Sequence, residues 1–235
     1  MLATLQEYAS NLFNVFYPNI CLACEKKLLK GERVFCFHCE SELPQTEQWL
    51  DTKNRLAQRF YGRIPLYGAA AFFQFYKGAE VQHLLHELKY RGKQEVGEYV
   101  GKMFGRKLQE ENSIIKKVDV IVPVPLHWKK MKIRGYNQCD CFAKGLSETL
   151  NVPYSTSAIE RTHENISQTK KKRFDRWENV AEIFSVKNEK EIFGKHVLLV
   201  DDVVTTGATA EACMQTILTV PGTRVSFAAM ATAMR

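Results

Sequence analysis

Residues 197–209, VLLVDDVVTTGAT, hold the residue types and spacing best suited to chemistry. An apolar run ends at two adjacent acids, Asp201 and Asp202, and a turn rich in hydroxyls follows. Carboxylates accept hydrogen bonds from sugar hydroxyls and attract Mg²⁺, while backbone N–H groups at the start of a helix hold a phosphate. This pattern predicts a site for a ribose 5-phosphate compound, of which phosphoribosyl pyrophosphate with Mg²⁺ fits best.

The phosphate-binding part of this segment is expected at Thr205, Thr206, Gly207, Ala208 and Thr209. Gly207 allows the backbone to approach the phosphate closely. The lysine of a G-x4-G-K-[ST] loop is missing, which excludes the usual nucleoside triphosphate site. A buried strand with an acidic turn and a threonine cap is the alternative, but such a turn would not require both acids and the whole TTGAT string.

Two C-x2-C pairs near the N-terminus form a second candidate site, with Cys21 and Cys24 in the first and Cys36 and Cys39 in the second. Four thiolates complete a closed tetrahedral zinc site, and closed coordination favours a structural role. His38 could replace one cysteine, and a redox pair is a further alternative, although a redox C-x-x-C pair would normally adjoin a βαβ unit. A segment of this size has too small a hydrophobic core to fold alone, and the zinc ion would therefore supply its folding energy.

Strands and helices alternate along the rest of the chain. Strands are expected at residues 66–76, 118–124, 155–159, 183–186, 197–200 and 224–230, and helices at 81–88, 95–110, 138–150 and 209–220. This order predicts an α/β fold with a mainly parallel sheet, helices on both faces and a ligand at the carboxyl ends of the strands. The expected domains are residues 1–62, with the cysteines and a linker, and residues 63–235.

Composition limits the setting of these sites. The chain has 235 residues, 45% of them apolar, and a formal charge of +7, which predicts a globular protein with an anionic partner. Residues 1–18 lack a basic leader and are interrupted by Asn11 and Asn14, so neither a signal peptide nor a membrane span is expected there. The expected compartment is the reducing cytoplasm, which favours metal ligands or buried thiols over disulfides.

Residues 197–209 closely resemble the phosphoribosyl-pyrophosphate loop of type I phosphoribosyltransferases. Three further features extend the resemblance: LKYRG at residues 88–92, VPVPLHWKKMKIRGYNQCDCFAKGL at 122–146, and the four cysteines. Together they resemble the ComF family of competence-associated phosphoribosyltransferase-like proteins over essentially the whole chain. The resemblance implies a type I phosphoribosyltransferase fold with a small N-terminal four-cysteine zinc-finger domain. It also implies a part in handling single-stranded DNA during natural transformation, beside other competence proteins such as a helicase or a DNA-processing protein.

Carried over by position, the resemblance implies that Asp201 and Asp202 hold the ribose hydroxyls and that residues 205–209 enclose the 5-phosphate. The anion loop for pyrophosphate would be Pro125, Leu126 and His127, with Arg134. Further positive charge follows this loop at Lys129, Lys130 and Lys132. These cations suit a pyrophosphate or a nucleic-acid backbone, and a solvated basic turn is the alternative.

Basic and aromatic residues are interleaved in NISQTKKKRFDRWEN, residues 165–179. The cations are Lys170, Lys171, Lys172, Arg173 and Arg176, next to Phe174 and Trp177. In the family fold a mobile lid lies here, but bases can also stack on such rings while phosphates meet the cations. Lid, DNA contact and plain solvated loop all stay open at this point.

Catalysis is less well specified than binding, and no catalytic residue is assigned. Thr205 stands where some relatives carry an acid, and a threonine cannot act as a base near neutral pH. An acceptor base would need a hood, expected from the N-terminal segment with Phe35 or Phe37 stacking on it. Cys139, Cys141 and Cys213 are expected to pack as small apolar residues without chemistry.

Three functions stay open: a phosphoribosyltransferase-like protein that binds single-stranded DNA, an active phosphoribosyltransferase on a nucleobase, and a regulatory sensor of phosphoribosyl pyrophosphate. The first is favoured.

Overall fold

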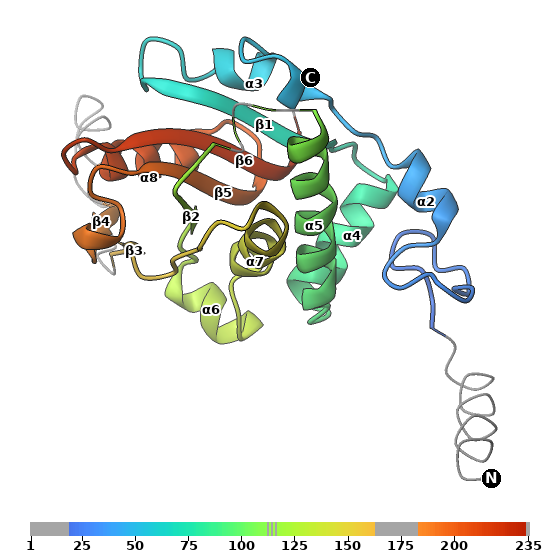
Figure 1. The fold of residues 1–235 in the computed structure, drawn as a ribbon. Helices are drawn as coiled ribbons and strands as arrows, with labels where there is room; N and C mark the ends of the chain where they lie inside the picture. The colour runs from blue at the N-terminus through green and yellow to red at the C-terminus, as the bar shows by residue number, and fades with distance from the viewer. Residues whose placement is uncertain (1–18, 112, 114, 116, 163–182, 234–235) are drawn as a thin grey trace, which may run out of the picture.

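A computed structural model describes residues 19–111, 113, 115, 117–162 and 183–233. Its centre is a sheet of four parallel strands in the order β1-β6-β5-β2 (Figure 1). The strands are β1 (Leu66–Gln74), β6 (Arg224–Thr232), β5 (His196–Val204) and β2 (Val120–Pro123). Tyr154 adds a parallel bridge to Ile121, on the outer side of β2. The predicted fold class, a mainly parallel sheet flanked by helices, is confirmed.

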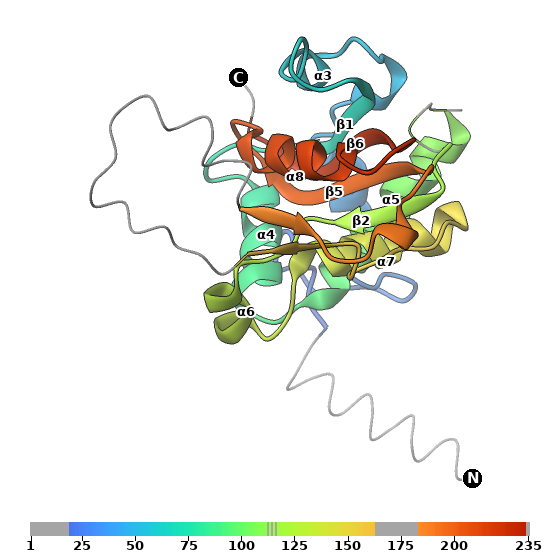
Figure 2. The ribbon, with the colours of Figure 1, turned by 90° about the vertical axis from the view of Figure 1, so that its left-hand side faces the viewer.

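Helices cover both faces of the sheet, as Figure 2 shows. One face carries α4 (Glu80–Tyr90), α5 (Gln94–Glu110) and α7 (Gln138–Leu150), and the other carries α3 (Arg55–Gln58) and α8 (Ala208–Leu218). The side chains of β5 alternate between the two cores, because successive residues of a strand point to opposite faces. Leu198 and Val200 belong to the first core, and Val197 and Leu199 to the second.

Helices α5 and α7 pack unusually closely, backbone against backbone. A Cβ atom built on Gly145 would lie 2.1 Å from the carbonyl oxygen of Glu98, and one on Gly101 would lie 2.5 Å from that of Phe142. Side chains at these positions would therefore push the helices apart. The glycines therefore let α7, whose first turn contacts the candidate site on β5, pack directly against α5.

Two short strands differ from the predicted parallel arrangement. β3 (Ile159–Arg161) and β4 (Phe184–Val186) form a separate antiparallel pair. Each buries one apolar side chain, Ile159 and Phe184, in the core beneath α8. One buried apolar side chain per strand is too little to predict whether the strand joins the main sheet. The basic segment with Lys170, Lys171, Lys172, Arg173 and Arg176 lies outside the described residues.

The stretch that precedes β1 packs on the sheet. Trp49, in the turn η1 (Gln48–Leu50), contacts the rings of Phe72 and Phe104 at centroid distances of 5.7 and 5.5 Å. The Asn54 side chain donates to the carbonyl of Ala69 at 2.6 Å. These contacts join the stretch to β1, and the boundary at residue 62 stays a prediction.

Candidate functional site

The two acids of the predicted sugar site lie within β5, which continues to Val204 instead of ending at Val200. Asp201 accepts two hydrogen bonds on Oδ1, from the backbone N–H of Asp202 at 2.8 Å and from Cys139 Sγ at 3.4 Å. Burial, together with the charge of Asp202, raises the pKa of Asp201 to about 7. Asp201 is therefore a carboxyl group poised to gain or lose a proton near neutral pH.

Asp202 is paired with a lysine that sequence reasoning left without a role. Lys89 Nζ, near the end of α4, lies 2.9 Å from Asp202 Oδ2, and both side chains are largely shielded from solvent. A cation thus already occupies the place beside Asp202 where a metal-bound sugar would be expected. The only signal in the sequence was the LKYRG motif that contains Lys89.

Other residues of LKYRG contact residues 133–138, IRGYNQ. The Arg134 guanidinium lies 5.3 Å from the centre of the Tyr90 ring, and the Tyr136 hydroxyl donates to the carbonyl of Leu88. Cys139 follows shortly afterwards and contacts Asp201. Three motifs that are distant in the sequence, at the end of α4, at the start of α7 and on β5, therefore meet at one place.

The predicted phosphate loop lies between β5 and α8. Gly207 has φ +84 and is buried, and a Cβ atom there would lie 3.1 Å from the Phe60 ring. A glycine therefore satisfies both the positive φ and the close approach. The other predicted residues, Thr205, Thr206, Ala208 and Thr209, are exposed.

Two arginines next to α3 hold this loop. Arg59 donates to the carbonyl of Thr205, and Arg63 forms an ion pair with Glu211 of α8 at 2.9 Å. Neither arginine was predicted, because the stretch before β1 has a polar composition typical of a linker.

The predicted anion loop begins at Pro125, two residues after the end of β2, and leads into a helix that was not predicted, α6 (Trp128–Arg134). His127 caps this helix, its Nδ1 accepting from the backbone N–H of Lys129 at 3.2 Å. The cations Lys129, Lys130, Lys132 and Arg134 therefore project from a helix. Lys129 and Lys132 lie 5.5 and 5.2 Å from the centre of the Trp128 ring.

A cleft of about 390 Å³, here called the α6 cleft, opens between α6, the start of α7 and β3. Its apolar lining is Pro123, Pro125, Leu126, Trp128, Met131 and Ile159. Its polar lining is Asn137, Asp140, Thr156, Glu160 and Arg161. Burial raises the pKa of Asp140 to about 6, although a hydrogen bond from Asn137 opposes the shift. Two of the predicted anion-loop residues, Pro125 and Leu126, thus line a cleft that also contains acids.

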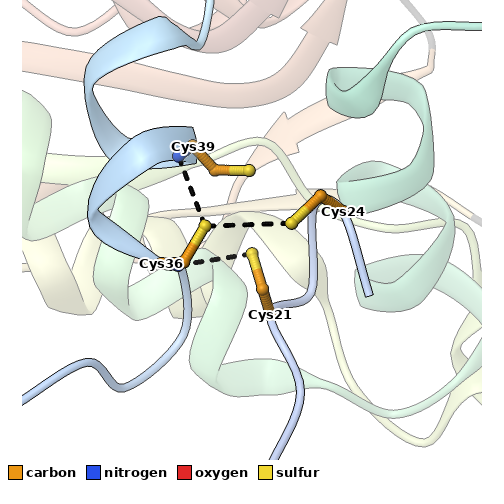
Figure 3. A group of neighbouring side chains, drawn as sticks. All are labelled: Cys21, Cys24, Cys36 and Cys39. Carbon is orange, nitrogen blue, oxygen red and sulfur yellow. Dashed lines mark hydrogen bonds between the residues drawn. The ribbon is translucent and has the colours of Figure 1, made fainter. Parts of the chain in front are cut away.

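The four cysteines lie together, as predicted, and Figure 3 shows their sulfurs pointing toward one another. All four sulfurs lie within 4.8 Å of one another, and those of Cys24 and Cys36 are 3.8 Å apart. Tetrahedral zinc with Zn–S bonds of about 2.3 Å needs sulfurs roughly 3.8 Å apart. His38 is exposed and does not belong to the group. The group can hold a metal ion, and zinc is the metal we propose.

The cysteine segment packs on α4 and α5. The Tyr99 hydroxyl donates to Glu40 at 2.8 Å, and His83 lies 3.5 Å from Glu25. Phe35 packs edge-on against the Tyr99 ring and is only 1% exposed, so the expectation that Phe35 could stack on a base is wrong. Phe37 is 62% exposed, and its stacking on a base stays a prediction.

We expect one zinc ion per chain, measured by elemental mass spectrometry on the purified protein. Cys36→Ser removes a ligand, so it should release the metal and lower Tm by roughly 5 °C or more. The matched control is His38→Ala, which should keep both metal and Tm. Loss of metal in the His38 variant, or full metal content in Cys36→Ser, would contradict the four-cysteine site.

Asp201→Asn should change how stability depends on pH. Because the pKa of Asp201 is raised on folding, its contribution to stability is full below about pH 4 and is lost as pH rises to about 7. The asparagine of the variant does not ionise, so its free energy of unfolding does not fall for this reason. The difference between variant and wild type should therefore increase from pH 4 to 7, by up to about 1.4 kcal/mol per pH unit. Urea unfolding across this range measures the difference. Exposed Glu148→Gln is the control, and parallel curves for Asp201→Asn and wild type would contradict the assignment.

No helix within the described residues is long and apolar enough to cross a membrane. Residues 137–235, which contain both acids and the loop before α8, match the family model for the phosphoribosyl transferase domain.

The curated proteins that are similar to the chain include the following three. Competence protein F of Haemophilus influenzae is 27% identical over 193 residues, 81% of this chain and 80% of that protein. DNA utilization protein YhgH of Escherichia coli K12 is 29% identical, but the match spans only 57% of this chain and 60% of that protein. Competence protein ComFC of Bacillus subtilis is 38% identical over 90 residues, 38% of this chain and 34% of that protein. With the matched domain and the cysteine group, these similarities support a ComF-family protein.

Proposed function

We propose that this ComF-family protein binds phosphoribosyl pyrophosphate, or a related ribose 5-phosphate compound, with Mg²⁺, and that it also binds single-stranded DNA during natural transformation. One observation carries the sugar-phosphate part. Inside the matched phosphoribosyl transferase domain, Asp201 and Asp202 stand on β5, and a Thr-Gly turn leads directly from that strand into α8. One continuous segment thus supplies carboxylates that can accept from ribose hydroxyls and backbone N–H groups that can hold a phosphate.

Binding at the acids would be an exchange of cations. Lys89 neutralises Asp202 at 2.9 Å, so a metal-bound sugar must displace its ammonium group before ribose hydroxyls can donate to the carboxylate. A new cation near Asp201 would also favour the ionised form of that group. Because the pKa of Asp201 is about 7, we expect binding to release a proton at neutral pH.

The phosphate would lie at the amino end of α8, where the helix dipole favours an anion. Gly207 is held against Phe60 from one side, and Arg59 holds the Thr205 carbonyl. These contacts fix the loop from the direction of α3, and the exposed side chains of Thr206 and Thr209 remain on the outside. The loop is thus shaped before a ligand arrives, which lowers the entropic cost of binding.

The DNA part depends on charge and on the relatives. The chain carries a formal charge of +7, and α6 presents Lys129, Lys130 and Lys132. The similar proteins are named for competence and for DNA utilization. Sequence reasoning adds the basic segment around Lys170, which lies outside the described residues.

Isothermal titration should detect binding of phosphoribosyl pyrophosphate in the presence of Mg²⁺. Asp202→Asn removes a charged acceptor, so we expect binding about tenfold weaker or more, and EDTA should weaken binding to wild type. Glu148→Gln, an equal change of charge on an exposed part of α7, should bind as wild type does. The sugar-phosphate proposal fails if millimolar ligand gives no binding, or if Asp202→Asn binds like wild type.

Fluorescence anisotropy with a labelled single-stranded 12-mer tests the DNA part without any sugar phosphate. Replacing Lys170, Lys171 and Lys172 by Gln should weaken binding and reduce the slope of log affinity against log salt by about 2, since each phosphate contact contributes roughly 0.7. The matched control replaces Lys117, Lys190 and Lys195, which precede the amino ends of β2 and β5, whereas the candidate site lies toward the carboxyl ends of these strands. Equal effects of the two triple variants would contradict a localised DNA contact.

A further inference from the structure

The α6 cleft is separate from the sugar-phosphate loop. Its lining comes from the end of β2, from α6, from the start of α7 and from the chain around β3, and no residue of 201–209 contributes to it. The two sites are nevertheless neighbours, because Cys139 contacts Asp201 while the next residue, Asp140, lines the cleft. A volume of about 390 Å³ lies in the range of small-ligand sites.

The walls of the α6 cleft suit a flat heteroaromatic group. Two prolines, Pro123 and Pro125, together with Met131 and Ile159 give the cleft an apolar wall opposite its polar residues. Trp128 adds an aromatic surface, over which Lys129 and Lys132 lie. Nucleobases stack on such rings whatever their sequence, because every base has a π-face.

One acceptor in the cleft is held in a fixed position. Asp140 Oδ1 accepts from Asn137 Nδ2 at 2.7 Å. Asn137 is itself fixed, since its Nδ2 also donates to the Val124 carbonyl at 3.0 Å and its Oδ1 accepts from the Cys139 N–H at 3.2 Å. A carboxylate held in this way can accept from the exocyclic amino group of a base, as carboxylates do with cytosine N4.

Basic residues flank this acid, and Glu160 is a second acid in the lining of the cleft. The exposed lysines of α6, Lys129, Lys130 and Lys132, stand beside the cleft, and Arg161 lines its far side over the Phe184 ring at 5.4 Å. Phosphates on either side of a seated base would meet these cations. A cleft with an apolar wall, one fixed acceptor and a basic rim therefore matches one nucleotide within a strand better than it matches a free anion.

We propose that the α6 cleft seats one base of single-stranded DNA, stacked beside Trp128 and recognised through its amino group by Asp140, while the lysines of α6 hold the neighbouring phosphates. This inference deepens the proposed DNA binding and rests on it. It predicts a preference among bases: cytosine offers an amino group to the carboxylate, whereas thymine presents a carbonyl oxygen at the same position.

The test compares oligo(dC) and oligo(dT) 12-mers by fluorescence anisotropy at pH 7.5. Wild type should bind oligo(dC) about five- to tenfold more tightly, and Asp140→Asn should reduce this preference to less than about twofold, because an amide can serve either base. Trp128→Leu should weaken binding to both oligonucleotides by about fivefold or more. Glu148→Gln, with the same change of charge on the same helix, should keep the preference.

Photo-crosslinking adds a measurement on wild type that does not depend on the folding of variants. An oligonucleotide with one 5-iodo-deoxycytidine should crosslink within residues 123–140, as mapped by mass spectrometry.

Binding without base preference that is unchanged by Asp140→Asn, or crosslinks only elsewhere, would overturn the base site while leaving DNA binding intact. Absence of any oligonucleotide binding would overturn the proposed DNA binding as well. If dCMP competes as strongly as the 12-mer at equal nucleotide concentration, the cleft is a mononucleotide site and the inference fails.

Discussion

Helices α5 and α7 touch through their backbones, with Gly101 and Gly145 at the point of closest approach. This contact fixes how closely α7 packs against α5, and the first turn of α7 carries the groups that face both candidate sites. Cys139 contacts Asp201 on one side, and Asp140 lines the α6 cleft on the other. A displacement of α7 by even one methyl group would therefore change the sugar-phosphate site and the cleft together.

Local patterns were sufficient to predict much of this arrangement. Four apolar residues before Asp201 indicate a buried strand, and α7 spans the predicted residues because its apolar positions have helical periodicity. The spacing of Cys21, Cys24, Cys36 and Cys39 likewise indicated their grouping, because ligands of one ion must converge. In each case the information lies within a short stretch of chain.

The parts that sequence reasoning missed depend on contacts between distant segments. The LKYRG motif contains Lys89 but does not indicate that this lysine would meet Asp202, and no motif marks Arg59 as a partner of the Thr205 carbonyl. The antiparallel pairing of β3 with β4 was missed because each strand has only three residues and too few anchors to indicate a partner. The α6 cleft could not be predicted from the sequence either, because four separate segments form it.

The position of β6 has a consequence for how the chain folds. β6 is the latest strand in the sequence among the described residues, yet it lies between β1 and β5. During synthesis β1 is made early, and the backbone edge that pairs with β6 stays unpaired until Arg224–Thr232 leaves the ribosome. Such long-range pairing is slow and exposes the nascent chain to aggregation. The stretch that precedes β1, with Trp49 against Phe72, can already shield that strand during the wait.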